Sequence, residues 1–224
     1  MVLVEMNDDS FKGGVMARRG PRGGGPAKRD RILQAAVKIF SQKGFFNSKV
    51  SDIAQSAGVA DGTIYLYFKN KDDLLISLFE EKMAEVVADA RARIAAGDDA
   101  LSRLRIFIEN HMGLLLREAG LIEVLQVELR QSNKFMKDYV PVKFLEYLDV
   151  ISEILELGKR EGTFRQDLNV TVARRAVFGA LDEMALAYVL SRKRKYDPAE
   201  AASEIYRIFA EGLCMKAKDR EART

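Results

Sequence analysis

The chain has 224 residues, of which 48% are hydrophobic and 31% charged, so it can bury a core and its composition favours a soluble globular protein. Its formal net charge is only +3, and its single cysteine, Cys214, excludes an intrachain disulfide and suits a reducing cytoplasm. No apolar run approaches the roughly 18 residues of a membrane span, so a membrane-spanning class is excluded and no membrane partner is expected.

The N-terminal residues 1–26 are rich in glycine and lack hydrophobic periodicity, which predicts a disordered arm. Lys and Arg crowd residues 17–49, where Asp30 is the one acid. A local excess of positive charge is typical of a nucleic-acid contact. The sequence leaves open whether the arm follows DNA or is a tail that contacts nothing.

Residues 27–43 predict the first helix, because apolar side chains recur on one of its faces. Lys43 places a cation in the last turn, and Gly44 can take the left-handed conformation that ends a helix. The apolar residues of this face are Ile32, Leu33, Ala36, Val37 and Phe40.

Residues 50–69 predict a helix-turn-helix. Gly58 breaks the first short helix, and the second begins near Asp61, where a carboxylate suits the helix dipole. Ile64 and Phe68 are four residues apart and are expected to face inward together. An ordinary pair of antiparallel helices with surface tyrosines remains the alternative.

The rest of the chain shows helical periodicity throughout, and Asn70 is expected to cap the fourth helix. The expected helices span about 71–95, 98–118, 119–131, 136–161, 169–192 and 198–217. The sequence therefore predicts an all-α protein. Its expected parts are the arm at 1–26, a three-helix DNA-binding domain at 27–71 and a helical ligand-binding and dimerisation domain at 72–224.

Motifs that would indicate an enzyme are missing from the sequence. There is one histidine, His111, and neither a Gly-x-Ser-x-Gly elbow, a His-Glu-x-x-His pair nor a Walker sequence accompanies it. His111 is expected to be a partly buried structural residue. No catalytic residue, metal site or cofactor is therefore predicted.

Several short motifs occur together between residues 32 and 74. They are Ile32-Leu33-Gln34-Ala35-Ala36, Val50-Ser51-Asp52-Ile53-Ala54, Ala57-Gly58-Val59, Gly62-Thr63-Ile64-Tyr65-Leu66-Tyr67-Phe68 and Lys69-Asn70-Lys71-Asp72-Asp73-Leu74. As a set they resemble the TetR family of bacterial transcriptional regulators. Residues 59–71, 127–133 and 178–183 resemble more narrowly the fatty-acid-degradation repressors of that family.

The resemblance implies a homodimeric repressor that binds double-stranded operator DNA and is released by long-chain acyl-CoA. The dimer would form through the last two helices, 169–192 and 198–217. The stripes expected to meet there are Phe178, Leu181, Ala185 and Tyr188, and Ile205, Ile208, Phe209 and Leu213, unless these pack inside the protomer. The alternatives are a TetR-type repressor that senses a drug or a free lipid, and a DNA-binding protein without a ligand.

The DNA contacts are expected at the start of the second helix of the helix-turn-helix and around it. Small and aromatic side chains there can reach bases, and hydroxyls and cations can reach phosphates. Tyr65 is assigned to bases, Thr63 to a base or a phosphate, and Gly62 to a close approach of the backbone. Asp61 is a further expected contact, and the residues assigned to phosphates are Ser48, Lys49, Tyr67 and Lys71.

The ligand contacts are expected to combine an apolar slot for an acyl chain with polar groups for its CoA head. The residues assigned are Phe107, Met112, Leu125, Arg130, Asn133, Phe144 and Phe178. Further candidates for the CoA phosphates are Arg91, Arg93, Arg105 and Lys134. From hydrophobic patterning alone, a closed core without a cavity remains the alternative for the apolar members.

Overall fold

The computed structural model of the protein describes residues 26–129, 139, 141–191 and 196–214. The α-helices are α1 (Pro26–Lys43), α2 (Val50–Ala57), α3 (Asp61–Tyr65), α4 (Lys71–Ile94), α5 (Ala100–Arg117), α6 (Ala119–Glu123), α8 (Val142–Arg160), α9 (Val170–Leu190) and α10 (Pro198–Leu213). A π-helical segment, η1 (Val124–Glu128), directly follows α6. The prediction of an all-α fold is confirmed. All but the last residue of the expected N-terminal arm lies outside the described residues.

Helix boundaries largely follow the capping signals of the sequence. Asn70 Oδ1 accepts a hydrogen bond from the backbone N–H of Asp73 at 2.8 Å, which starts α4 as predicted. Gly44 and Gly58 have φ angles of 76° and 64°, the left-handed conformation expected where α1 and α2 end.

Two of the expected helices differ from those in the structure. The predicted helix at 136–161 begins only at Val142, because Tyr139 and Pro141 are not helical. Proline has no N–H to donate, so it is well tolerated at the start of a helix, and Pro141 directly precedes α8. The predicted helix at 119–131 changes from α to π geometry at Val124.

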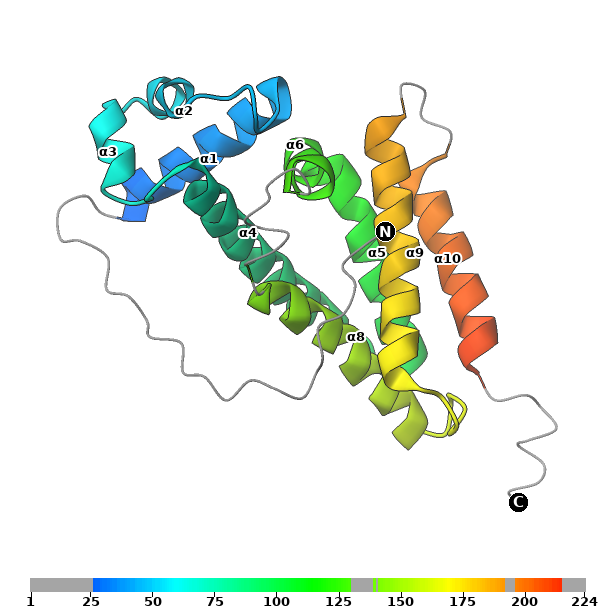
Figure 1. The fold of residues 1–224 in the computed structure, drawn as a ribbon. Coiled ribbons are helices and arrows are strands. Elements are labelled where there is room, and N and C mark those ends of the chain that lie inside the picture. The colour runs from blue at the N-terminus through cyan, green and yellow to red at the C-terminus, as the bar shows by residue number, and fades with distance from the viewer. Residues whose placement is uncertain (1–25, 130–138, 140, 192–195, 215–224) are drawn as a thin grey trace, which may run out of the picture.

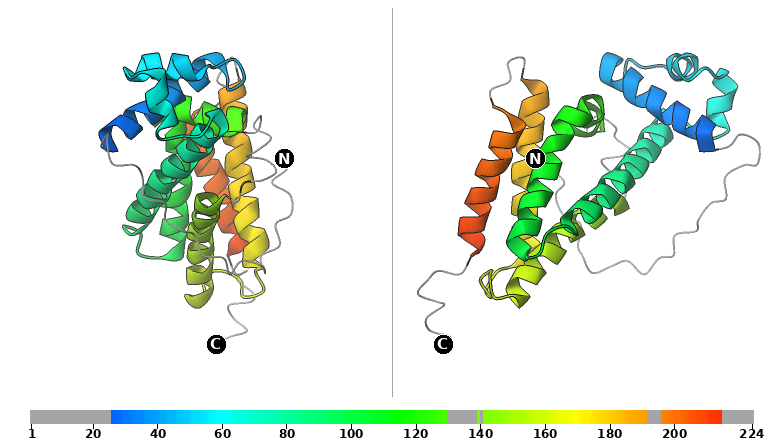
Figure 2. Two further views of the ribbon diagram at one scale, coloured as in Figure 1. Left: turned by 60° about the vertical axis from the view of Figure 1, so that its left-hand side comes forward. Right: turned by 180° about the vertical axis from the view of Figure 1, so that it is seen from behind.

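The helix α4 joins two groups of helices (Figure 1). Helices α1–α3 cluster at its N-terminal end, and α8 and α5 pack along its C-terminal part. The view from behind in Figure 2 shows α5, α9 and α10 running side by side on the far side of α4. Helix α10 packs chiefly on α5.

The stripes expected at the dimer contact lie mainly inside the protomer. Leu181 and Ala185 are buried, as are Tyr188, Ile205 and Leu213. Helices α9 and α10 also expose large apolar side chains: Val172, Leu190 and Ile208 are 64%, 63% and 59% exposed. Among the described residues, no helix is long and apolar enough to span a membrane.

Candidate nucleic-acid interface and cavity

Helices α2 and α3 are held together by a turn at Gly58 and by a small shared core. The N–H of Val59 donates to the carbonyl of Ala54 at 3.0 Å, which closes the turn. Ile53 and Ile64 are no more than 1% exposed, so α3 is fixed on α2 by buried apolar contacts. This arrangement is a helix-turn-helix, as the sequence predicts.

The outward side of α3 carries most of the residues expected to read DNA. Tyr65 is 57% exposed, and Asp61 and Gly62 are exposed beside it. Thr63 and Tyr67 are half-buried, so each presents only part of its side chain to solvent. Lys49, immediately before α2, is also exposed.

Two residues expected to contact phosphate are instead engaged within the protein. Ser48 is only 3% exposed, and its hydroxyl donates to the carbonyl of Gly44 at 2.6 Å. The ammonium group of Lys71 donates to the carbonyls of Phe45, Phe46 and Ser48 at 2.6, 3.2 and 3.0 Å. An ammonium group has three N–H donors, so these bonds use all of them. In this geometry neither group is available to a DNA phosphate, and the assignment of Lys71 and Ser48 to phosphates stays a prediction.

Lys71 instead anchors the loop that precedes α2. Its Nζ lies 4.5 Å from the centre of the Phe45 ring, in addition to the three carbonyls. Burial lowers the pKa of Lys71, and the charge of Asp72 opposes that shift. The start of α4 is thus tied to the start of α2, which sets how the helix-turn-helix sits on the rest of the chain.

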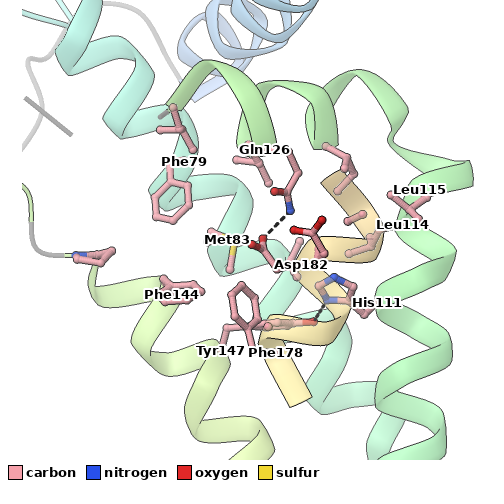
Figure 3. Close-up of a pocket in the computed structure, with 18 of the residues that line it drawn as sticks. Phe79, Met83, His111, Leu114, Leu115, Gln126, Phe144, Tyr147, Phe178 and Asp182 are labelled. Carbon is pink, nitrogen blue, oxygen red and sulfur yellow. Dashed lines mark hydrogen bonds between the residues drawn. The ribbon is translucent and has the colours of Figure 1, made fainter. Parts of the chain in front are cut away.

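A cavity of about 380 Å³ lies between α4, α5, η1, α8 and α9 (Figure 3). Its wall is mostly apolar and aromatic, as in many sites for small organic ligands. The lining residues are Phe79, Met83, Val86, His111, Leu114, Leu115, Ile122, Leu125, Gln126, Leu129, Pro141, Phe144, Tyr147, Arg175, Phe178, Gly179, Asp182, Glu183 and Ala185.

Two hydrogen-bonded pairs interrupt this apolar wall (Figure 3). His111 Nδ1 lies 2.7 Å from the hydroxyl of Tyr147, and Gln126 Nε2 donates to Asp182 Oδ1 at 2.7 Å. Burial lowers the pKa of His111 to about 4, although the negative charge of Asp182 opposes the shift. Burial also raises the pKa of Tyr147. His111 is therefore a neutral imidazole near pH 7.

The expected ligand residues are only partly brought together. Leu125, Phe144 and Phe178 line the cavity, and the last two rings meet edge to face with centroids 4.8 Å apart. Phe107 and Met112 are fully buried and do not line it. The ring centroids of Phe107 and Tyr147 lie 5.1 Å apart. Met112 follows His111 on α5, so its side chain is rotated by about 100° around the helix axis.

The expected contacts to the CoA head are the least supported by the geometry. Arg130, Asn133 and Lys134 lie outside the described residues. Arg91 and Arg93 pair with Glu153 and Asp89, and Arg105 stacks on Tyr206 at 4.3 Å, so these cations are engaged away from the lining residues. Among the described lining residues, the cation is Arg175, which is exposed on α9.

Sequence reasoning missed the polar residues of the cavity. His111 was assigned a purely structural role, and Gln126, Tyr147 and Asp182 were not assigned at all. The available signal was Asp182, which follows Phe178 by four residues on the inward side of α9 and precedes the buried Ala185 by three. A charged residue on a buried helical face needs a partner or a ligand.

The cavity wall and the DNA-binding helices share two elements. Helix α4 and the α6–η1 segment both line the cavity and pack against α1. Arg29 of α1 forms an ion pair with Glu81 of α4. A Cβ atom at Gly120 of α6 would lie 3.5 Å from Ser41 Oγ of α1, which shows how closely those helices approach.

A helix-turn-helix on a long helix, with a helical unit beyond it that contains an apolar cavity, defines the class as a DNA-binding transcriptional regulator, not an enzyme. Residues 32–78 match the family model described as "Bacterial regulatory proteins, tetR family", and residues 79–212 match "YsiA-like protein, C-terminal region". The chain belongs to the TetR family of transcriptional regulators.

Relatives with assigned roles match most of the chain. It is 38% identical over 183 residues to the fatty acid metabolism regulator protein of Bacillus subtilis, covering 82% of this chain and 94% of that protein. The structure of the fatty acid degradation regulator FadR from Bacillus halodurans has a TM-score of 0.76 at 39% identity, covering 82% and 98% of the two chains. FadR from Bacillus subtilis in complex with stearoyl-CoA has a TM-score of 0.76 at 38% identity, with the same coverage.

Replacing Lys71 with Met should destabilise the protein, because three loop carbonyls would lose their donor. We expect the free energy of unfolding to fall by about 1–3 kcal/mol, measured by urea denaturation. Lys69→Met is the matched control, because Lys69 is exposed nearby and should change stability by no more than about 0.5 kcal/mol. Equal effects of the two substitutions would contradict the anchoring role.

His111 should make stability depend on pH in a defined window. Its pKa is about 4 in the folded protein and about 6.5 in the unfolded chain, so the unfolded chain takes up the proton first. The free energy of unfolding should therefore fall as the pH drops from about 6.5 towards 4. His111→Asn should make this fall shallower. Parallel curves for the two proteins would show that His111 has an ordinary pKa.

Proposed function

We propose that the protein is a cytoplasmic homodimer that represses fatty-acid degradation genes and leaves its operator when long-chain acyl-CoA binds. The observation that carries the proposal is the cavity, whose walls α4 and α6–η1 also pack on α1. A ligand there lies directly against the support of the DNA-binding helices. The relative that was crystallised with stearoyl-CoA supports the choice of effector.

On the DNA side, the proposed contacts are those residues that remain accessible. Tyr65 offers a ring to thymine methyl groups and a hydroxyl to an acceptor, and Gly62 lets the backbone approach closely. Asp61, Thr63, Tyr67 and Lys49 complete the proposed contact set. Two copies would address half-sites about 34–36 Å apart in successive major grooves.

The proposed dimer contact uses the exposed faces of α9 and α10. Val172 and Leu190 of α9 and Ile208 of α10 are large, apolar and exposed. Small exposed residues share these faces and would let helices of two copies approach closely. They are Ala176, Gly179, Ala187 and Gly212. Burial of these faces in a second copy would remove the apolar surface from water.

The cavity suits an acyl chain along most of its wall. Phe144, Phe178 and the aliphatic side chains of α4 and α5 offer no hydrogen bonds, as an acyl chain requires. Arg175 supplies a cation for a CoA phosphate, and Arg130 and Asn133 remain proposed partners of the CoA head. No reacting group is needed for this role.

The proposed release follows from linkage between the two sites. A ligand that fits better when α4 or η1 is displaced favours a dimer whose recognition helices no longer match two half-sites. A coupling free energy of about 1–3 kcal/mol, typical of allosteric proteins, would weaken operator binding roughly 5- to 150-fold. Operator DNA must then weaken acyl-CoA binding by the same factor.

A hydrophobic cationic drug is the second candidate effector. Asp182 and Glu183 both line the cavity beside aromatic rings, and such a wall favours a cation. Against this, Gln126 already donates to Asp182, which satisfies part of the hydrogen-bonding need of that carboxylate. A free lipid is the remaining alternative.

Tyr65→Ala should weaken operator-specific binding and leave a folded dimer, because the side chain is exposed and supports no core. Fluorescence anisotropy with operator DNA and with a scrambled duplex should show a loss of about 1–3 kcal/mol for the operator alone. Tyr65→Phe is the matched control, since it keeps the ring and removes only the hydroxyl. Unchanged operator affinity in Tyr65→Ala would contradict the assignment of Tyr65 to the operator bases.

Acyl-CoA should release the wild-type protein from its operator, and a variant with a filled cavity should not respond. Leu125→Trp adds a ring where η1 lines the cavity, so we expect near-normal operator binding and no release by palmitoyl-CoA. Leu116→Trp is the matched control, because Leu116 is 57% exposed on α5 and does not line the cavity.

Native mass spectrometry provides the decisive readout, because it reports dimer mass, bound acyl-CoA and bound operator in one measurement. The proposal requires that few dimers carry both ligands at once. If palmitoyl-CoA binds the free and the operator-bound dimer equally tightly, it is not the inducer. Release by a cationic drug, with no response to acyl-CoA, would favour the second candidate.

A further inference from the structure

The Nε2 atom of His111 faces the cavity and can form a hydrogen bond there. The Nδ1 atom of His111 is paired with Tyr147, and Figure 3 shows the other ring nitrogen turned toward the side where Gln126 and Asp182 lie. Within the described part of the chain, this Nε2 has no hydrogen-bond partner. The ring is fixed in place by aromatic neighbours, with centroids 5.9 Å from Tyr147 and 6.4 Å from Phe178.

The pairing with Tyr147 determines which nitrogen carries the proton. The hydroxyl of Tyr147 is fully buried, and His111 is its hydrogen-bond partner in the described structure. If the hydroxyl donates to Nδ1, its own hydrogen is satisfied and the ring proton must sit on Nε2. The opposite arrangement would leave a buried O–H without an acceptor, which costs about 1–3 kcal/mol. The favoured tautomer therefore directs an N–H donor into the cavity.

The charge of the His111 ring limits which kind of ligand acceptor its N–H can bind. Burial lowers the pKa of His111 to about 4, so the ring is a neutral donor and not a cation near pH 7. The charged residues of the surrounding wall are Asp182, Glu183 and Arg175. The two carboxylates would repel an anionic group of the ligand, and the neutral ring does not attract one. The N–H donor therefore suits an uncharged acceptor, such as the carbonyl oxygen of a thioester.

We propose that His111 Nε2–H donates a hydrogen bond to the thioester carbonyl of the bound acyl-CoA, with Tyr147 as the residue that fixes the tautomer. The inference rests on the proposed acyl-CoA effector and adds to it the place where the acyl group joins its head. The apolar wall then receives the carbon chain, and His111 sets its register in the cavity.

Palmitoyl-CoA and its thioether analogue, S-hexadecyl-CoA, differ at the carbonyl and so test this donor directly. Isothermal titration of the full-length dimer should give roughly 2- to 10-fold tighter binding of the thioester, as expected for one hydrogen bond. The double variant His111→Phe with Tyr147→Phe keeps an aromatic ring at each position and leaves no buried hydroxyl without a partner. It should bind the two compounds within about twofold of each other.

Leu116→Met is the matched control, because Leu116 is exposed on α5, does not line the cavity and carries no donor. It should keep the wild-type preference for the thioester. Equal binding of the two compounds to the wild type would overturn the role of His111 and leave the effector assignment intact. An unchanged preference in the double variant would also overturn it. Binding of neither compound would overturn the effector assignment and this inference together.

A second measurement does not depend on any variant. His111 is the only histidine of the chain, so its ring signals in a nitrogen-15 NMR spectrum need no assignment. The ligand-free dimer should show the Nε2–H tautomer. Palmitoyl-CoA should shift the Nε2 signal strongly, and S-hexadecyl-CoA should shift it little. The Nδ1–H tautomer, or equal shifts with the two compounds, would overturn the proposal.

Discussion

The packing of α1 against α4 and the α6–η1 segment is the contact on which the rest of the structure depends. It joins the helix-turn-helix to the cavity, because α4 and η1 are also cavity walls. The ion pair of Arg29 and Glu81 and the close approach of Gly120 to α1 hold this contact in one geometry. The proposed release requires a second packed arrangement of this contact, in which the helix-turn-helix would move as a whole.

Helix α4 is the covalent connection between the two groups of helices, but packing of α1 on the α6–η1 segment also connects them. The residues of η1 that line the cavity are a few positions away from Gly120 of α6, which lies close to α1. At the other end of the same contact, Lys71 ties the first turn of α4 to the loop before α2. Both contacts therefore connect the cavity walls to the helix-turn-helix, one through helix packing and the other through the hydrogen bonds of Lys71.

The cavity combines an apolar wall with a few fixed polar groups. For the proposed ligand, the aromatic and aliphatic side chains would supply affinity, whereas His111, Tyr147, Gln126 and Asp182 would orient it. Each of these polar groups has a hydrogen-bond partner from another helix, which offsets the cost of burial. The same bonds hold α5 to α8, and η1 to α9, around the cavity.

The sequence by itself determined the all-α class, the helix-turn-helix and most helix boundaries, because periodicity and capping are local properties. Gly58, Asn70 and the Ile64–Phe68 pair act within a few residues of themselves. Only the tertiary structure decided which apolar residues line a cavity and which, like Phe107, fill the core. It also turned Lys71 inward and paired His111 with Tyr147, 36 residues away. Such pairings depend on how helices rotate and pack against one another, and no pattern within one segment carries that information.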